Sequence, residues 1–139
     1  MRCLALNVYF EARGEPLKGR YAVAAVTLNR VASPDFPNTI CQVVLQGVEY
    51  GRDRCQFSWV CDGRSDHPSD VKAWRSARNV ALNTLFRKPP DPTKGALCFH
   101  ATRVRPAWSR VMVRVVRIGR HIYYRQPTTV AQDNHAPPS

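Results

Sequence analysis

The chain has 139 residues, enough for one compact domain with its own core, and 44% of them are hydrophobic. No apolar run approaches the roughly 20 residues of a membrane-spanning helix, so no transmembrane segment is predicted. The formal net charge is +11, and residues 71–139 carry all of the excess, because residues 1–70 hold eight basic and eight acidic side chains. Such an excess favours a polyanionic partner, which could be nucleic acid, an anionic cell wall or a membrane surface.

Helices are predicted first along the chain. Residues 2–12 form a short helix that is apolar on nearly every side and is therefore expected to be buried, and Gly14 and Pro16 end it. A second helix is predicted over residues 18–31. Asn38 or Thr39 is expected to cap a short helix that runs through Val44 and Leu45.

The middle and the end of the chain give a mixed pattern. Residues 47–67 read as irregular, with an extended piece over 56–60, and residues 68–86 form the clearest amphipathic helix. Strands are predicted over the segments 96–99, 111–116 and 121–124. Residues 126–139 are expected to be a disordered tail. Helices that precede strands predict an α+β domain over residues 1–125.

The five cysteines are Cys3, Cys41, Cys55, Cys61 and Cys98. Because their number is odd, at least one has no partner within the chain. One or two disulfides and a set of buried free thiols are both open. A zinc site built from Cys55, Cys61, His67, Cys98 and His100 is disfavoured, because the spacings Cys-x5-Cys and Cys-x-His match no common structural zinc pattern.

Glu11 is the strongest candidate for chemistry. It is one of only three glutamates, and it lies at the end of an otherwise buried helix, four residues after Asn7 on the same stripe. Partial desolvation raises the pKa of a carboxyl group, and a carboxyl that stays protonated near neutral pH can act as a general acid in glycosidic cleavage. The structural alternative is an ion pair between Glu11 and Arg13 or an arginine of the second half.

Ordinary glycoside hydrolysis needs a second carboxylate. The candidates are Glu15, Asp62 and Asp66, and no spacing selects one; Glu15 sits in a Gly-Glu-Pro turn that is expected to be exposed. In the segment 55–63, Gln56 and Ser58 are expected to face one side of an extended strand, and Phe57 and Trp59 the other. Amide and hydroxyl groups beside aromatic rings suit sugar binding, although a half-buried strand closed by a disulfide would show the same pattern.

Seven arginines and no acidic residue occur between Arg103 and Arg125, with Trp108, Tyr123 and Tyr124 among them. This segment suits a nucleic-acid face, an anionic-wall face or a solvated sheet surface. Arg114 and Arg120 are expected to point to solvent.

Five blocks of the sequence, in one order, resemble those of the SleB/CwlJ-type cell-wall hydrolases, the family of spore-cortex-lytic catalytic domains and of phage endolysin-like members. The resemblance covers residues 3–125. The blocks are 4–16 with its E-A-R-G-E motif, 22–39, 55–63, 98–108 and 118–124.

The resemblance implies a lysozyme- or lytic-transglycosylase-like fold, with N-terminal helices followed by a small antiparallel sheet. It also implies a peptidoglycan glycosidase that cleaves between N-acetylmuramic acid and N-acetylglucosamine, with Glu11 as its catalytic acid and no metal or cofactor. The muramic acid C6 hydroxyl would attack C1 and close a 1,6-anhydro ring, so that no second carboxylate is needed. Glu15, Gln56, Ser58 and His100 are expected to bind substrate.

The expected partners are glycan strands of peptidoglycan and an anionic bacterial envelope, with no specific nucleic acid, and the protein is expected to be a monomer. No signal peptide is predicted, since the apolar stretch of residues 3–10 runs directly into Glu11 and Glu15. Action in the periplasm or cell wall therefore implies release through a phage pore, or a chain cut from a longer secreted protein. A hydrolytic muramidase and a non-enzymatic basic binding module remain the alternatives.

Overall fold

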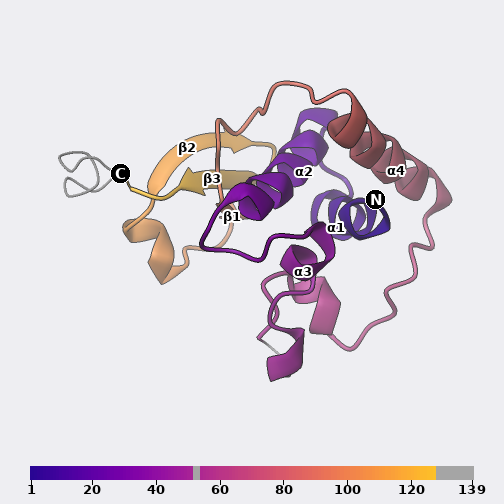
Figure 1. Cartoon of the computed structure of the whole chain (residues 1–139), viewed down its shortest axis with the longest axis horizontal. Helices are drawn as coiled ribbons and strands as arrows, with labels where there is room; N and C mark the ends of the chain where they lie inside the picture. The colour runs from indigo at the N-terminus through magenta and orange to yellow at the C-terminus, as the bar shows by residue number, and fades with distance from the viewer. Residues whose placement is uncertain (52–53, 128–139) are drawn as a thin grey trace.

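The computed structural model describes residues 1–51 and 54–127. Four α-helices precede a three-stranded antiparallel sheet within this part of the chain, as expected for an α+β domain (Figure 1). The elements are α1 (Arg2–Ala12), α2 (Leu17–Ala32), α3 (Ile40–Val44), α4 (Val71–Phe86), β1 (Cys98–Ala101), β2 (Val113–Ile118) and β3 (His121–Arg125), with short 3₁₀ helices η1 (Val48–Tyr50), η2 (Ser58–Cys61) and η3 (Ala107–Arg110).

The predicted helices are confirmed, and two of them start at side-chain caps. The hydroxyl of Thr39 accepts a hydrogen bond from the Gln42 N–H at the start of α3, and Asp70 accepts one from the Ala73 N–H at the start of α4. These caps satisfy backbone donors that have no partner within the helix. The predicted tail falls largely on residues 128–139, which lie outside the described residues.

Three local predictions are wrong. The first strand begins at Cys98 and not at residue 96, and the second begins at Val113 and not at residue 111. The segment 56–60 is not extended but enters η2. A disulfide joins Cys55 to Cys61 with their Cα atoms 6.1 Å apart, whereas six extended steps would span about 20 Å. The predicted separation of side chains is still observed without a strand, because Phe57 and Trp59 are buried while Gln56 and Ser58 are exposed.

Helix α1 lies at the centre of the molecule. Helices α2, α3 and α4 all contact it, which explains why its sequence is apolar on nearly every side (Figure 1). The core around it includes Leu4, Ala5, Val8, Tyr9 and Ala12, all buried. Helix α1, whose last turn carries Glu11, is therefore held by three neighbouring helices.

The sheet has the order β1-β3-β2, and a register shift between Arg114 and Val116 marks a bulge in β2. It packs on α2 through a second buried cluster, and Figure 1 shows α2 between the sheet and α4. Two side chains near the end of α2 bind the backbone that leads into β1. Asn29 Nδ2 donates to the Ala96 carbonyl at 2.9 Å, and Arg30 Nε donates to the Leu97 carbonyl at 2.7 Å.

A chain of buried hydrogen bonds links three distant segments. The Trp59 indole Nε1–H donates to Asn7 Oδ1 at 2.9 Å, Asn7 Nδ2 donates to Thr27 Oγ1 at 3.1 Å, and Thr27 Oγ1 donates to the Val23 carbonyl at 2.9 Å. Asn7 and Thr27 have no exposed surface. Since every polar group in this series of hydrogen bonds is paired, the series fixes η2 against α1 and α2.

Glu15 is buried, and its predicted exposure is wrong. Its carboxylate accepts a hydrogen bond from the Arg120 backbone N–H at 2.9 Å and another from Arg120 Nε at 3.1 Å. Arg120 therefore does not simply point to solvent as expected, although its side chain stays 72% exposed. Gly119 lies between them at φ +58°, where a Cβ would overlap Glu15 Oε1. Glu15 thus fastens the α1–α2 turn to the β2–β3 turn.

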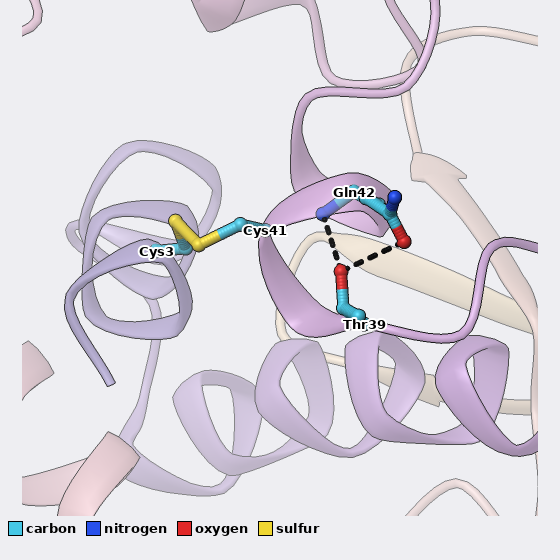
Figure 2. The surroundings of a disulfide bond; sticks show 4 residues. All are labelled: Cys3, Thr39, Cys41 and Gln42. Atoms are coloured by element: carbon cyan, nitrogen blue, oxygen red, sulfur yellow. Dashed lines mark hydrogen bonds between the residues drawn. A yellow bond between two sulfur atoms is a disulfide. The ribbon is translucent and has the colours of Figure 1, made fainter.

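A disulfide joins Cys3 at the start of α1 to Cys41 in α3, with Cα atoms 5.3 Å apart (Figure 2). Figure 2 also shows Thr39 and Gln42 paired beside Cys41 at the start of α3. Cys98 is a free, half-buried thiol. The expectation of one or two disulfides is confirmed, and the alternative that all five cysteines are buried free thiols is wrong.

We expect Asn7→Ala to lower the free energy of unfolding by about 1–3 kcal/mol, because it leaves the buried Trp59 indole N–H without an acceptor. Urea unfolding measures the change. The matched control is Asn83→Ala, which removes a half-buried hydrogen bond to the Tyr21 hydroxyl and should cost less than about 1 kcal/mol. Equal losses in the two variants would contradict a special role for the Asn7 network.

Replacing Cys3 and Cys41 together by serine should destabilise the protein more than replacing Cys55 and Cys61. The first pair closes a sequence separation of 38 residues and the second a separation of 6. Loop-closure entropy then predicts losses of about 4 and about 2 kcal/mol. Thermal unfolding under non-reducing conditions ranks the two double variants; the reverse order would show that chain entropy is not the main contribution.

Candidate active site

Glu11 lies in the last turn of α1, half-buried, next to the site where the helix ends. Burial raises the pKa of its carboxyl group from 4.5 to about 7, against a smaller opposing effect of the positive charge on Arg30. No ion pair to Glu11 occurs within residues 1–51 and 54–127. Arg13, the partner considered from the sequence, donates instead to the Tyr9 hydroxyl.

A cavity of about 520 Å³ opens beside Glu11. Its walls come from the last turns of α1, from η2 and from the connection that leads to α4. Ser58, predicted to bind substrate, lies on this wall, and so does Asp62. Polar side chains dominate the rest of the connecting wall, namely Arg64, Ser65, His67 and Ser69. The cavity thus combines the buried carboxyl group of Glu11 with several hydroxyl and charged groups, Asp62 among them, on an exposed segment.

Arg30 is the functional candidate that the sequence reasoning did not single out. Its side chain is buried, its guanidinium lies 4.9 Å from the Phe36 ring centroid and 5.0 Å from that of Phe57, and Nη1 has no hydrogen-bond partner among the described residues. Burial lowers the pKa of Arg30, and interactions with the neighbouring Cys98 and Glu11 oppose that effect. The spacing held a signal, because Arg30 shares a helical stripe with the buried Val23 and Val26.

The three candidates for a second carboxylate are now separated. Asp62 shares the cavity with Glu11, and its Oδ1 accepts the Arg64 backbone N–H at 2.9 Å. Glu15 is engaged by Arg120 and lines no cavity near Glu11, and Asp66 is exposed outside the cavity wall. Of the three candidates, Asp62 is therefore the one that lines the cavity beside Glu11.

Gln56 and His100, the other predicted substrate residues, do not line the Glu11 cavity. Gln56 lines a neighbouring cavity of about 210 Å³ together with Arg30, Cys98 and Trp108. His100 lines neither cavity: its Nε2 is 2.8 Å from the Tyr124 hydroxyl, and its ring lies 5.6 Å from that of Trp108. The structure thus brings Glu11 and Ser58 together, places Gln56 next to them, and leaves Glu15 and His100 outside.

A cavity of about 770 Å³ lies beside α3 and η1, and neither Glu11 nor Arg30 lines it. No group of three or more His, Cys, Asp or Glu side chains that could hold a metal ion occurs in the described part of the chain. Over the same residues, none of the helices has the length and apolar character needed to cross a bilayer.

Comparison with known proteins agrees with this architecture. A family model described as Cell Wall Hydrolase matches residues 14–124. The spore cortex-lytic enzyme of Bacillus subtilis (strain 168) is 35% identical over 124 residues, which make up 88% of this chain and 36% of that protein. Its Bacillus cereus counterpart is 34% identical over 124 residues, or 88% and 43% of the two chains. The chain thus spans less than half the length of these curated relatives.

Two solved structures have the same fold. The catalytic domain of the germination-specific lytic transglycosylase SleB from Bacillus anthracis superposes with a TM-score of 0.71 at 32% identity, over 89% of this chain and 92% of that one. The catalytic domain of Bacillus cereus SleB gives a TM-score of 0.65 at 31% identity, over 88% of each chain. These matches confirm the expected fold, and the chain belongs to the cell wall hydrolase family, with the architecture of the SleB catalytic domain.

Proposed function

We propose that this protein cleaves the glycan strands of peptidoglycan between N-acetylmuramic acid and N-acetylglucosamine, with Glu11 as the general acid. The observation that carries the proposal is a carboxyl group with a pKa of about 7 that opens onto a polar cavity and has no ion-pair partner in the described residues. A carboxyl with a pKa of about 7 is about half protonated at neutral pH, whereas an ordinary carboxyl is almost fully ionised there, and the protonated form can pass its proton to a leaving oxygen. One of the similar catalytic domains is described as that of a germination-specific lytic transglycosylase, which supports the same reaction class.

In the reaction, Glu11 donates its proton to the glycosidic oxygen as the bond to C1 of N-acetylmuramic acid breaks. The C4 hydroxyl of N-acetylglucosamine leaves, and the Glu11 carboxylate removes the proton from the C6 hydroxyl of N-acetylmuramic acid. The C6 oxygen bonds to C1 and closes the 1,6-anhydro ring, and Glu11, which now carries the proton of the C6 hydroxyl, is protonated as it was at the start. One carboxyl group serves as acid and then as base, and no water is consumed.

Arg30 supports the intermediate step of this scheme. Its positive charge favours the ionised form of Glu11, while burial favours the neutral form more strongly. The balance leaves Glu11 protonated before cleavage and lowers the free energy of the carboxylate that forms during it. Because Arg30 is held by the Leu97 carbonyl and two aromatic rings, its charge stays near Glu11 without forming an ion pair that would neutralise the acid.

A hydrolytic muramidase is the second candidate, and the position of Asp62 favours it. Asp62 lies on the wall of the same cavity as Glu11, where a carboxylate could activate a water molecule or stabilise positive charge at C1. The transglycosylase scheme assigns no such role to Asp62. The two reactions therefore differ in their products and in their dependence on this residue.

The partners follow from the proposed substrate and the surface charge. The excess of basic residues in the second half of the chain suits an anionic bacterial envelope, and exposed Arg75, Arg78 and Arg87 belong to α4 or its end. The protein would act in the periplasm or cell wall, as a monomer, and a lytic role such as that of a phage endolysin fits this charge. The description as spore cortex-lytic enzymes belongs to the relatives, and specificity for spore cortex is not proposed for this protein.

The first prediction of the proposal concerns the products. Purified peptidoglycan digested by the wild-type protein should release anhydro-muropeptides, read by mass spectrometry, and Glu11→Gln should release none, because the amide cannot donate the proton. Asp62→Asn should retain most of the activity if the C6 hydroxyl is the nucleophile.

Three other results are informative. Reducing muropeptides from wild type, with loss of activity in Asp62→Asn, would replace the transglycosylase by the hydrolase. Full activity of Glu11→Gln would remove Glu11 as the acid. A folded wild-type protein that binds but never digests peptidoglycan would leave the basic binding module as the better account.

The second prediction concerns pH. Glu11 must carry its proton before cleavage, so kcat/KM on solubilised glycan should fall as pH rises through about 7. Well above that value the decrease should approach about tenfold per pH unit, because the protonated fraction falls in proportion. Asp62→Asn, measured under the same conditions, should show the same alkaline limb. A limb between pH 4 and 5 in wild type would show that burial does not hold the Glu11 proton in the working enzyme.

A further inference from the structure

We propose that the small cavity beside Trp108 is a second sugar subsite, which binds the glycan strand next to the residue cleaved at Glu11. The inference rests on the proposed function, since it concerns the same substrate. The cavity measures about 210 Å³, and its wall includes Arg30, Gln56, Phe99, Trp108 and Met112. An open site that combines an aromatic side chain with a few convergent polar groups is typical of ligand recognition in proteins.

Trp108 is a large apolar side chain that stays 37% exposed on η3, yet its ring is held in place from behind. The Trp108 ring lies 5.2 Å from the Tyr124 ring and 5.6 Å from the His100 ring, and both contacts are edge-to-face. The Tyr124 and His100 rings stack on each other and join through a 2.8 Å hydrogen bond. An indole fixed in this way offers an apolar surface to a sugar ring at little cost in side-chain entropy.

Polar groups for the sugar substituents line the same cavity. Gln56 is exposed, and its backbone N–H donates to the Gln46 carbonyl at 3.0 Å, so its main chain is fixed while its amide is free to bind. Arg30 is 5% exposed, and its Nη1 has no hydrogen-bond partner in the described residues. A buried donor without a partner is costly. Nη1 is not exposed at the cavity surface, so the carbonyl oxygen of an acetamido group would accept from it only if the Arg30 side chain shifts on binding.

The two cavities share the segment that leads into η2. Ser58 lines the Glu11 cavity and Gln56, two residues earlier, lines the Trp108 cavity, while Phe57 and Trp59 anchor the segment in the core. Arg30 lines the Trp108 cavity and lies close enough to Glu11 for its charge to act on that carboxyl. A glycan strand that follows this segment would therefore meet Glu11 and Trp108 in succession, and the ligand class is an N-acetylated hexosamine.

The test measures glycan binding apart from cleavage. Glu11→Gln protein is titrated with chitohexaose and chitobiose by isothermal titration calorimetry, with and without Trp108→Ala. We expect Trp108→Ala to weaken hexaose binding roughly tenfold and to remove most of the preference for the longer sugar. Phe86→Ala is the matched control, since Phe86 is a 76% exposed aromatic residue that lines neither cavity, and it should leave both affinities unchanged.

Two further variants protect the result from trivial causes. Trp108→Tyr keeps an aromatic surface and should recover most of the binding, whereas a variant that merely disturbs the fold would not be rescued. Gln56→Ala should weaken hexaose binding with an unchanged thermal midpoint. Hexaose affinity equal to that of the Phe86→Ala control in a folded Trp108→Ala protein would overturn the subsite. Wild-type digestion of peptidoglycan is measured separately. Unchanged hexaose affinity in Trp108→Ala would therefore contradict the subsite and not the proposed reaction, whereas absent digestion would contradict the proposed reaction and not the subsite.

Discussion

The hydrogen bonds from Trp59 to Asn7 and from Asn7 to Thr27 hold the candidate site together, because they join three segments that are far apart in the sequence. Asn7 lies one turn before Glu11 on α1. The residue that accepts the Trp59 hydrogen bond is therefore on the same rigid helix as Glu11. A buried amide is costly unless both of its ends are paired, and here both are. The same bonds therefore make the fold specific and place the η2 wall beside Glu11.

The site also depends on an unequal balance of charge. Glu11 is desolvated enough to favour its neutral form, and Arg30 opposes that preference without contacting it as an ion pair. A direct ion pair would stabilise the carboxylate and remove the proton that the proposed chemistry needs. Arg30 is instead held by the Leu97 carbonyl and by the faces of Phe36 and Phe57. The packing of α2 against the start of β1 thus contributes directly to the acidity of a residue on α1.

The motif E-A-R-G-E divides its two glutamates between different tasks. Glu11 ends the central helix and faces a cavity, whereas Glu15, four residues later, lies beyond the turn and binds the backbone and side chain of Arg120. This clamp brings the sheet against the helices, and Gly119 permits the close approach. One glutamate of the motif therefore faces the candidate site and the other holds the architecture, a division that spacing alone does not reveal.

The sequence by itself determined the elements whose signals are local: the apolar α1, the amphipathic α4, a cap for α3 at Asn38 or Thr39, and Glu11 as a carboxyl at the end of a buried helix. Tertiary structure decided the features that need contacts between distant segments. The segment expected to be a strand is closed by the Cys55–Cys61 disulfide and enters η2. Glu15 is buried where it binds Arg120, and the packing of α2 on the sheet places Arg30 near Glu11. Desolvation and pairing depend on which remote groups surround a side chain, and a linear pattern does not contain that information.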